Sequence, residues 1–442
     1  MSRSHRNHFV LCGIIGAFYL YPFIGLAQQA PSSLQKSPEK NIIIGVSMGA
    51  ATPSGVSSVR SMRMAVEEIN AAGGIGGKNI ALKVEYGNSK DAASMDKTIY
   101  QLIDSGAVCI ISGSGSGNTL RAAQIAVSKG IMLMTAASSS PRISEVADNN
   151  LVWRTIPSDV FQAQVAAEIL HKKKLHTVGI IAINNAYGTA LAASFAKSFQ
   201  KLGGKVVASV SYPDIASYDA FSFKTQLDTL YAQKPSAIYL VSYNDDGAKI
   251  VSDSKGYFTA SFKPFIFGCD GNYNNDFLLA VDPSMVEGME GLCFVHPMKY
   301  ANYDTFFAKF KEYSQKSTDM SDLANISLAN MLDVESTNSY AATSYDAIYT
   351  FALAALKAAS LKPADIAKQM PLISQASKGA APINVGEFAK AAALLKQGKT
   401  INYEGASGPV DFDAKGDVTH GTYILWRIAG GKFVEAGTVA FP

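Results

Sequence analysis

Two short runs of small and hydroxyl-bearing residues could bind an anion such as a carboxylate. The run Ser112 to Asn118 reads SGSGSGN, and the run Thr135 to Pro141 reads TAASSSP. Each run directly follows an apolar stretch. Glycines let the backbone approach a ligand closely, and free N–H groups at a helix start, together with serine hydroxyls, favour a small anion. Either run taken alone is equally typical of a tight turn or a helix N-cap.

Three residues later in the chain could bind the opposite end of a small zwitterion. Tyr187, Tyr243 and Asp270 each lie just past an apolar run. In open α/β sheets, ligands bind outside the carboxyl ends of the strands, which is where these residues would lie. Singly, each is typical of a turn or a rim. Together they offer two aromatic walls and one carboxylate, which would suit an ammonium group.

The segment Gly45 to Gly49 reads GVSMG and matches the Gly-x-Ser-x-Gly elbow of serine hydrolases. Such a site also needs a general base and an orienting carboxylate. Four histidines follow residue 27, none of them in a distinctive sequence context: His171, His176, His296 and His420. The pattern is short and recurs by chance, so a hydrolase with Ser47 as nucleophile is a distant alternative. That alternative predicts ester turnover that Ser47→Ala abolishes.

Three cysteines follow residue 27: Cys109, Cys269 and Cys293. Beyond residue 27 the sequence has neither a Cys-x-x-Cys motif nor a histidine pair at helical spacing, so it indicates no zinc site and no redox dithiol. We expect no metal and no cofactor. Cys269 and Cys293 are near enough in sequence to form one disulfide in an oxidising compartment, and the alternative is that all three are buried thiols.

The composition is that of a folded protein with no polyanion-binding character. The chain has 442 residues, of which 48% are hydrophobic and 17% charged, and its formal net charge is +3. At roughly 150 residues per domain, this length indicates two or three domains. The nearly neutral charge argues against a nucleic-acid partner, and the hydrophobic content excludes disorder over the whole length.

Residues 1–27 have the form of a secretory signal peptide. Arg3 and Arg6 precede an apolar run that ends in small residues at Ala27. We therefore expect cleavage after Ala27 and a periplasmic location. The alternative is a membrane anchor, because the run is nearly long enough to span a bilayer. Residues 28–40 are polar, contain two prolines and are typical of a linker.

From residue 41 onward, short apolar runs alternate with amphipathic stretches. The runs that we expect to be strands are 42–46, 80–86, 107–112, 131–135, 177–183, 205–212, 237–242, 265–268 and 291–295. Helical stretches such as 188–202 lie between most of them. This alternation predicts an α/β fold with parallel sheets and helices on both faces. So many units exceed one sheet, so we expect two lobes that divide near 153–159 and again near 295–297.

The remainder of the chain is less regular. Residues 313–338 are polar and weakly periodic, which is typical of an insertion. Residues 340–359 have the pattern of a helix. Residues 405–417 form a glycine-rich stretch that we expect to lead into a final hairpin around 423–426.

Five stretches in suitable positions of the βα units form a recognisable series. They are residues 65–77 (AVEEINAAGGIGG), 137–141 (ASSSP), 152–155 (VWRT), 186–188 (AYG) and 345–347 (YDA). From residue 41 to the C-terminus the sequence resembles the leucine/isoleucine/valine-binding protein family, the type I solute-binding proteins of ABC importers. The resemblance implies two Rossmann-like lobes with parallel sheets joined by a three-strand hinge, the Venus-flytrap architecture. Lobe 1 would contain 41–157 plus 297–419, and lobe 2 would contain 158–296 plus 420–442.

The resemblance also implies roles for residues of the first lobe. Ser116 and Ser139 match positions that hold the α-carboxylate of an amino acid. Ala137 matches a position whose backbone carbonyl meets the ammonium group, and Ser138 lies beside it. Ser54 falls where leucine-type members can place a tryptophan against the ligand's side chain. The disulfide of the family's first lobe has no counterpart in this sequence.

Three second-lobe positions of the family are matched by Tyr187, Tyr243 and Asp270. Asp270 stands in place of a usual glutamate that pairs with the ammonium group, and this shorter acid is a departure from the pattern. The site for the amino-acid backbone is thus largely kept, while the side-chain pocket is altered. The ligand would be leucine, isoleucine or valine, or else a smaller or more polar amino acid or an amide.

The function that the resemblance implies is capture without catalysis. A monomeric binding protein would close around an amino acid or similar zwitterion and deliver it to the membrane permease of an ABC importer. A sensory or receptor-presenting protein of the same fold is the second reading.

Overall fold

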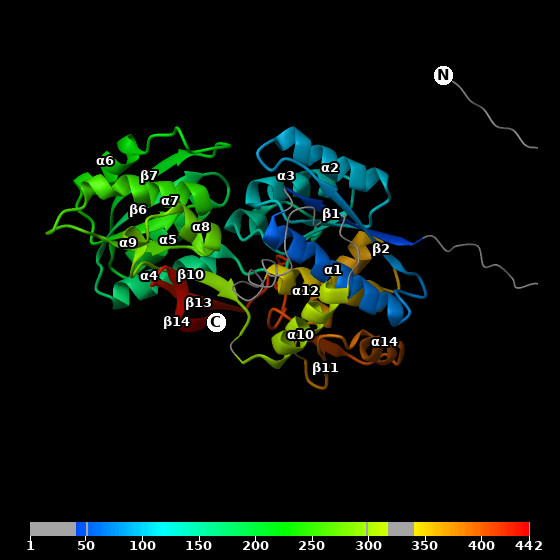
Figure 1. Cartoon of the computed structure of the whole chain (residues 1–442). Coiled ribbons are helices and arrows are strands. Elements are labelled where there is room, and N and C mark those ends of the chain that lie inside the picture. Colours follow the sequence, from blue (N-terminus) through cyan, green and yellow to red (C-terminus); the bar gives the residue numbers. More distant parts are fainter. Residues whose placement is uncertain (1–40, 50–51, 298, 317–339, 376, 442) are drawn as a thin grey trace, which may run out of the picture. The chain divides into compact units, whose positions relative to one another are not determined.

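The computed structural model describes residues 41–49, 52–297, 299–316, 340–375 and 377–441 (Figure 1). The predicted signal peptide (1–27) and linker (28–40) lie outside these residues. Most of the predicted insertion at 313–338 lies outside them too, but its first residues belong to helix α10 (Ala301–Lys316). None of the described helices is long and apolar enough to cross a membrane.

The first sheet has five parallel strands in the order β2-β1-β3-β4-β5. Their bounds are β1 Ile42–Met48, β2 Ile80–Tyr86, β3 Cys109–Ser112, β4 Met132–Thr135 and β5 Val152–Arg154. The register places Ile44 opposite Cys109, and Cys109 opposite Met132. Because all pairs are parallel, the carboxyl ends of β3 and β4 meet at the same edge of the sheet, as the sequence predicts.

Helices cover both faces of this sheet, and the pleat decides which core each strand residue joins. Helices α1 (Pro53–Ala71) and α12 (Tyr340–Ala358) pack on one face, where they share a core with Cys109 and Ile111 of β3. Helices α2 (Ala92–Asp104) and α3 (Ser116–Ser128) pack on the other face against Ile110. A strand covered on both faces must be apolar at every position, which explains the unbroken apolar runs of the sequence.

The second sheet has seven strands in the order β14-β13-β10-β9-β8-β6-β7. Their bounds are β6 Thr177–Asn184, β7 Lys205–Pro213, β8 Ala237–Val241, β9 Phe265–Gly268, β10 Glu290–Val295, β13 Gly421–Ala429 and β14 Lys432–Phe441. The five strands from β7 to β10 pair in parallel, and β13 and β14 form the predicted hairpin, in which β13 pairs antiparallel with β10. The predicted strands are therefore confirmed, and so is the α/β architecture with two lobes.

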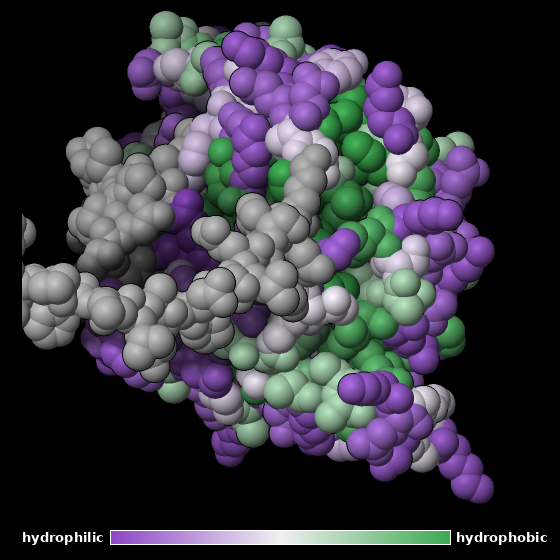
Figure 2. Space-filling model, turned by 90° about the vertical axis from the view of Figure 1, so that its right-hand side faces the viewer, coloured by the Kyte–Doolittle hydropathy of each residue, from purple (hydrophilic) through white to green (hydrophobic). Residues whose placement is uncertain are grey.

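The other elements surround these sheets. They are helices α4 (Asp159–Lys172), α5 (Gly188–Lys201), α6 (Lys224–Ala232), α7 (Asn244–Asp253), α8 (Asn275–Ala280), α9 (Pro283–Val286), α13 (Pro363–Ala367) and α14 (Phe388–Lys396), strands β11 (Ala381–Ile383) and β12 (Ile401–Tyr403), and the 3-10 turns η1 (Pro141–Glu145), η2 (Ser254–Tyr257), η3 (Asp270–Asn272) and η4 (Met370–Ile373). Figure 2 shows one face, on which hydrophobic residues gather in a central band bordered by hydrophilic ones.

The chain passes between the two sheets at three places within the described residues. It leaves the first sheet after β5, comes back after β10 to elements such as α12 that pack on that sheet, and crosses to the second sheet again before β13. We propose lobe boundaries at these passages, with 41–157 plus 297–419 in one lobe and 158–296 plus 420–442 in the other. Three connections near one another would allow a hinge motion but prevent free rotation of the lobes.

Candidate functional site

The two hydroxyl runs lie side by side, because β3 and β4 are neighbours in the first sheet. After β3 the chain turns at Gly115, whose φ of 86° lies in the left-handed region that glycine adopts without strain. Helix α3 then begins at Ser116, which is buried. The backbone N–H of Ser140 donates to the Ser116 hydroxyl at 3.3 Å, so the second run is bonded directly to the start of the helix.

A chain of hydrogen-bonded hydroxyl groups holds the second run, Thr135 to Pro141, in place. Thr135 at the end of β4 donates to the carbonyl of Ser112 at 2.8 Å and accepts from the backbone N–H of Ser138 at 3.1 Å. The Ser138 hydroxyl pairs with Thr119 of α3 at 2.8 Å, and Thr119 pairs with the Ser112 hydroxyl at 2.9 Å. Ser138 is therefore engaged in holding the loop, whereas its neighbour Ser139 points elsewhere.

The Ser139 hydroxyl donates to Asp159 Oδ2 at 2.9 Å. Asp159 is buried in the first turn of α4 and was not among the site residues that the sequence suggested. The side-chain amide of Gln162, one turn further along, donates to Asp159 Oδ1 at 3.0 Å and to Asp270 Oδ1 at 2.9 Å. The Gln162 carbonyl oxygen accepts from the backbone N–H of Asp270 at 3.0 Å. Gln162 thus bridges two carboxylates.

Asp270 begins the turn η3 after β9 and is bonded to one of the predicted aromatic residues. The Tyr187 hydroxyl donates to Asp270 Oδ1 at 2.6 Å and contacts Cys269 Sγ at 3.1 Å. The Tyr187 and Tyr243 rings stack with centroids 5.3 Å apart and 20° between their planes. Hydrogen bonds and this ring contact therefore connect Ser139 to Tyr243 through Asp159, Gln162, Asp270 and Tyr187.

Two buried carboxyl groups, those of Asp159 and Asp270, lie close together in this network. Burial and repulsion from Asp270 raise the pKa of Asp159 well above its usual range. Burial also raises the pKa of Asp270, against the opposing effect of its bonds from Tyr187 and Gln162. Within the described residues, no lysine or arginine forms an ion pair with either carboxylate. A small cation such as an ammonium group would relieve the repulsion.

The remaining predicted residues are less closely connected. Ala137 is half-buried, and its N–H donates to Thr135 at 3.4 Å. Ser54 lies in the first turn of α1, with its hydroxyl 3.4 Å from that of Thr52. Within the described residues we find no hydrogen bond between Ser54 and the other predicted site residues, so the structure does not bring it into the network.

The serine of the hydrolase motif lies in the interior. Ser47 belongs to β1, is fully buried, and shares a 2.6 Å hydrogen bond with Thr98 of α2. A nucleophile elbow requires an exposed serine at a strand-to-helix turn. The distant alternative of a Ser47 nucleophile is therefore wrong, because Ser47 is buried in a strand that continues past it to Met48.

The three cysteines are free and buried. Burial raises the pKa of the Cys269 thiol to about 12, and that of Cys109 and Cys293 also lies well above the usual range of a thiol. Of the two alternatives left open by the sequence, the structure has the buried thiols. Within the described residues, no cluster of three or more His, Cys, Asp or Glu side chains could hold a metal ion.

A cavity of about 810 Å³ lies away from this network, between α1, β2 and α10. Its walls carry charges of both signs that already pair with each other, as Lys309 does with Glu68 at 2.7 Å. Tyr345 and Tyr349 also donate to Glu68. We assign no ligand to this cavity.

Comparison with known proteins identifies the family. Residues 58–431 match the model of the family "Receptor family ligand binding region", and the chain belongs to that family. It is 26% identical over 262 residues to the Leu/Ile/Val/Thr-binding protein of Salmonella typhimurium. The aligned residues make up 59% of this chain and 68% of that protein.

Two further relatives cover more of the chain. One is the "Chemotactic signal transduction system substrate-binding protein BasB" of Halobacterium salinarum, 23% identical over 362 residues, 80% of this chain and 78% of that protein. The other is the crystal structure of a leucine binding protein, LivK, from Thermotoga maritima, with a TM-score of 0.69 at 19% identity, covering 90% of this chain and 98% of that one. The fold is thus that of the type I periplasmic binding proteins, as the sequence predicted.

Proposed function

We propose that this protein is an exported solute-binding protein that captures an amino acid, of branched-chain type or related, and delivers it to the permease of an ABC importer. The observation that carries the proposal is the connected network from Ser139 to Asp270. It places neutral donors and two carboxylates next to each other at the strand ends of two sheets. The relatives named above, which include leucine-binding proteins, support the same reading.

The carboxylate of the zwitterion would bind to lobe 1, and the ammonium group would bind to the acids of lobe 2 and to one carbonyl of lobe 1. The hydroxyls of Ser116 and Ser139, with the N–H groups at the start of α3, would hold the carboxylate. Asp270 and Asp159 would share the ammonium group, and the backbone carbonyl of Ala137 would accept a further hydrogen bond from it. Tyr187 and Tyr243 would form a wall against the ligand.

This division explains why both lobes are needed. Removing a charge from water costs several kcal/mol unless it is paired, so neither lobe alone would bind the zwitterion tightly. Micromolar affinity needs only about 8 kcal/mol of net binding free energy. Closure of the lobes over the ligand would supply the missing partners and present the complex to the permease.

Export is part of the proposal. A signal peptide at residues 1–27, cut after Ala27, would release a monomeric periplasmic protein, with residues 28–40 as its linker. A solute-binding protein must meet its ligand outside the cytoplasm, so the two proposals agree with each other. A processed N-terminus at Gln28, found by sequencing the exported protein, would support them.

A ligand-presenting sensory protein is the second candidate, favoured by the similarity to the chemotactic protein BasB. Both functions use the same amino-acid site, so binding does not separate them. Deleting the gene separates the two functions. Loss of amino-acid uptake with normal chemotaxis supports transport, whereas loss of chemotaxis towards the amino acid with normal uptake supports sensing.

A thermal-shift screen against the twenty amino acids and their amides tests the site. Saturating ligand at about 100 times its Kd stabilises the protein by about 2.7 kcal/mol, which gives a clear rise in melting temperature. For L-leucine the matched controls are isoamylamine, which lacks the carboxylate, and N-acetyl-L-leucine, which lacks the ammonium group. We expect neither control to shift the melting temperature. If no amino acid or amide shifts it, the proposed function is wrong.

A further inference from the structure

A fully buried arginine, Arg154, connects the loop after β4 (residues 136–144, the ligand loop) to the last crossover between the sheets. Its side chain forms a bidentate ion pair with Asp417, from Nε to Oδ1 at 2.7 Å and from Nη2 to Oδ2 at 2.8 Å. Asp417 lies four residues before β13 of the second sheet, whereas Arg154 ends β5 of the first. The two residues are 263 positions apart in the chain.

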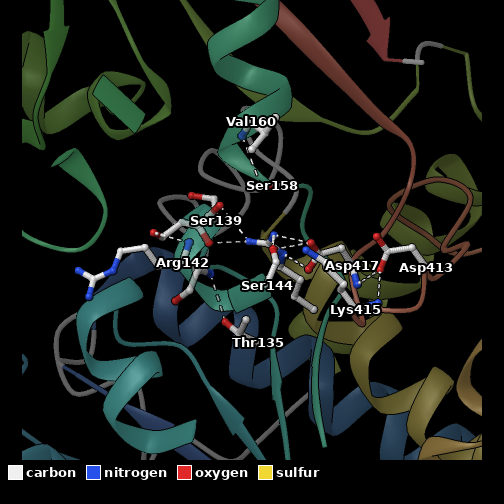
Figure 3. Close-up of polar contacts among 12 residues, drawn as sticks. Thr135, Ser139, Arg142, Ser144, Ser158, Val160, Asp413, Lys415 and Asp417 are labelled. Carbon is white, nitrogen blue, oxygen red and sulfur yellow. Dashed lines mark hydrogen bonds and ion pairs between the residues drawn. The ribbon is translucent and has the colours of Figure 1, made fainter. Parts of the chain in front are cut away.

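The other donors of the guanidinium group point at the ligand loop. Nη1 donates to the carbonyl oxygens of Ser139 at 3.0 Å and Ser140 at 2.9 Å. Nη2 also donates to the Ser144 hydroxyl at 2.7 Å, and that hydroxyl donates to Asp417 Oδ2 at 2.6 Å. Figure 3 shows Ser139, Ser144 and Asp417 converging on one centre. All five N–H donors of the arginine are therefore used, which a lysine with three donors could not reproduce.

The crossover is held against β5 by its backbone as well. The N–H of Arg154 donates to the carbonyl of Gly416 at 2.9 Å. Gly416 has φ of 78°, and a Cβ there would lie 2.3 Å from the carbonyl oxygen of Val152. The Asp413 carboxylate accepts from the backbone N–H groups of Lys415 and Asp417 at 2.7 and 3.0 Å, which shapes the turn that presents Asp417.

We propose that Arg154 and Asp417 are positioning residues. They couple the conformation of the ligand loop to the position of the last crossover between the sheets. This inference deepens the proposed function and rests on it. The pair fixes the carbonyls of Ser139 and Ser140, and so aims the Ser139 hydroxyl at Asp159 and the Ser140 hydroxyl at the carbonyl of Ala186, at 2.6 Å. Movement of the second lobe would act on the carboxylate-binding donors through Asp417.

The test compares Asp417→Asn with a matched control, Asp96→Asn. Asp96 also forms a bidentate pair with an arginine, Arg121, but that pair is exposed and joins α2 to α3. Titration calorimetry with L-leucine should show Kd raised about tenfold or more by Asp417→Asn and less than about twofold by Asp96→Asn, about 1.4 kcal/mol being tenfold. Hydrogen exchange of residues 136–144 should become faster in Asp417→Asn and stay unchanged in Asp96→Asn.

Two further variants decide the outcome if Asp417→Asn does not fold. Ser144→Ala removes one contact of the guanidinium, and we expect about a threefold weaker Kd with faster exchange of the loop. Arg154→Lys should weaken binding as Asp417→Asn does. Unchanged Kd and unchanged loop exchange in the folded variants overturn the proposal. If the wild type binds no amino acid, the proposed function fails, whereas the loop-exchange measurement still tests the coupling by itself.

Discussion

Replacing Asp270 by asparagine should weaken amino-acid binding strongly while leaving the fold intact. Asparagine has the shape of aspartate, and its carbonyl oxygen can still accept the bonds that Oδ1 now accepts from Tyr187 and Gln162. The substitution therefore removes the negative charge with little change in the network. Any loss of affinity then reports the interaction between this charge and the ligand's ammonium group.

The size of the effect follows from the geometry. At a charge separation of about 4 Å and an effective dielectric constant of about 20, an ammonium–carboxylate attraction is about 4 kcal/mol. The charge of Asp270 also repels Asp159: both carboxylates lie within 3.0 Å of the same Gln162 nitrogen, so their oxygens are within about 6 Å of each other. Losing that repulsion lowers the cost of the buried charges, and Asp159 still attracts the ligand. We expect a net loss of about 2–3 kcal/mol, or about 30- to 150-fold in Kd.

Titration calorimetry with L-leucine measures the effect, and Asp159→Asn is the matched control for the second acid. If both acids hold the ammonium group, each single variant should weaken binding, and the double variant should lose more than the two losses added, because relief of the mutual repulsion offsets part of each single loss but counts only once in the double variant. An Asp270→Asn variant with native melting temperature and a Kd within twofold of wild type would falsify the role of Asp270.

Three other expectations concern pH, the interior and the contact between the lobes. Because burial raises the pKa of Asp159 and Asp270, the stability that they contribute to the ligand-free fold is present at low pH and is lost as the pH rises through their raised pKa values. The ammonium group of leucine favours the ionised form of both acids, so binding should release protons. Binding should therefore weaken as the pH falls through that range. Calorimetry in buffers of different ionisation enthalpy measures the proton release. Ser47→Ala should lower the free energy of unfolding by about 1 kcal/mol in urea, through loss of a buried hydrogen bond, with leucine affinity unchanged. Lys90→Met should weaken binding less than about fivefold and only at low salt, because its ion pair with Asp214 of the other lobe is partly exposed; an equal effect at high salt would contradict an electrostatic role.

The sequence was informative where function depends on strand ends. The two hydroxyl runs, Tyr187 and Asp270 were predicted because each follows a recognisable apolar run, and the family resemblance then singled out Ser116 and Ser139 within the runs. The structure connects the corresponding loops by hydrogen bonds. Parallel pairing brings such ends to one edge, so a local pattern suffices to suggest a site. Whether these residues bind the ligand is what the variants above test.

Asp159 and Gln162 were missed although a signal for them is present. Ser158 already serves as the N-cap of α4, since its hydroxyl accepts from the N–H of Val160 at 3.4 Å. An acid directly after a complete cap is not needed for capping and can serve another role. The spacing of three residues then places Asp159 and Gln162 on the same side of the helix.

Other features depend on contacts that no local pattern contains. The register of β9 and β10 pairs Gly268 with Gly291. Cys269 lies just past the end of β9, at the start of η3, whereas Cys293 lies within β10, so the two thiols belong to different local structures. Nearness in sequence suggested a disulfide, but both thiols are free and buried. The Arg154–Asp417 pair is equally invisible, because it joins segments 263 residues apart.

The hydrogen bond between Ser139 and Asp159 suggests how the site would select an amino acid. The serine hydroxyl donates to the acid, so a ligand that engages both residues has to replace this bond. An α-amino acid could replace both partners at once, with its carboxylate accepting from Ser139 and its ammonium group donating to Asp159. An amine without a carboxylate would leave the serine donor unpaired, and an acid without an amine would leave two buried carboxylates facing each other, each at a cost of about 1–3 kcal/mol or more. If the proposed function holds, recognition of the amino-acid backbone follows from the network itself, whereas the choice of side chain depends on residues outside it.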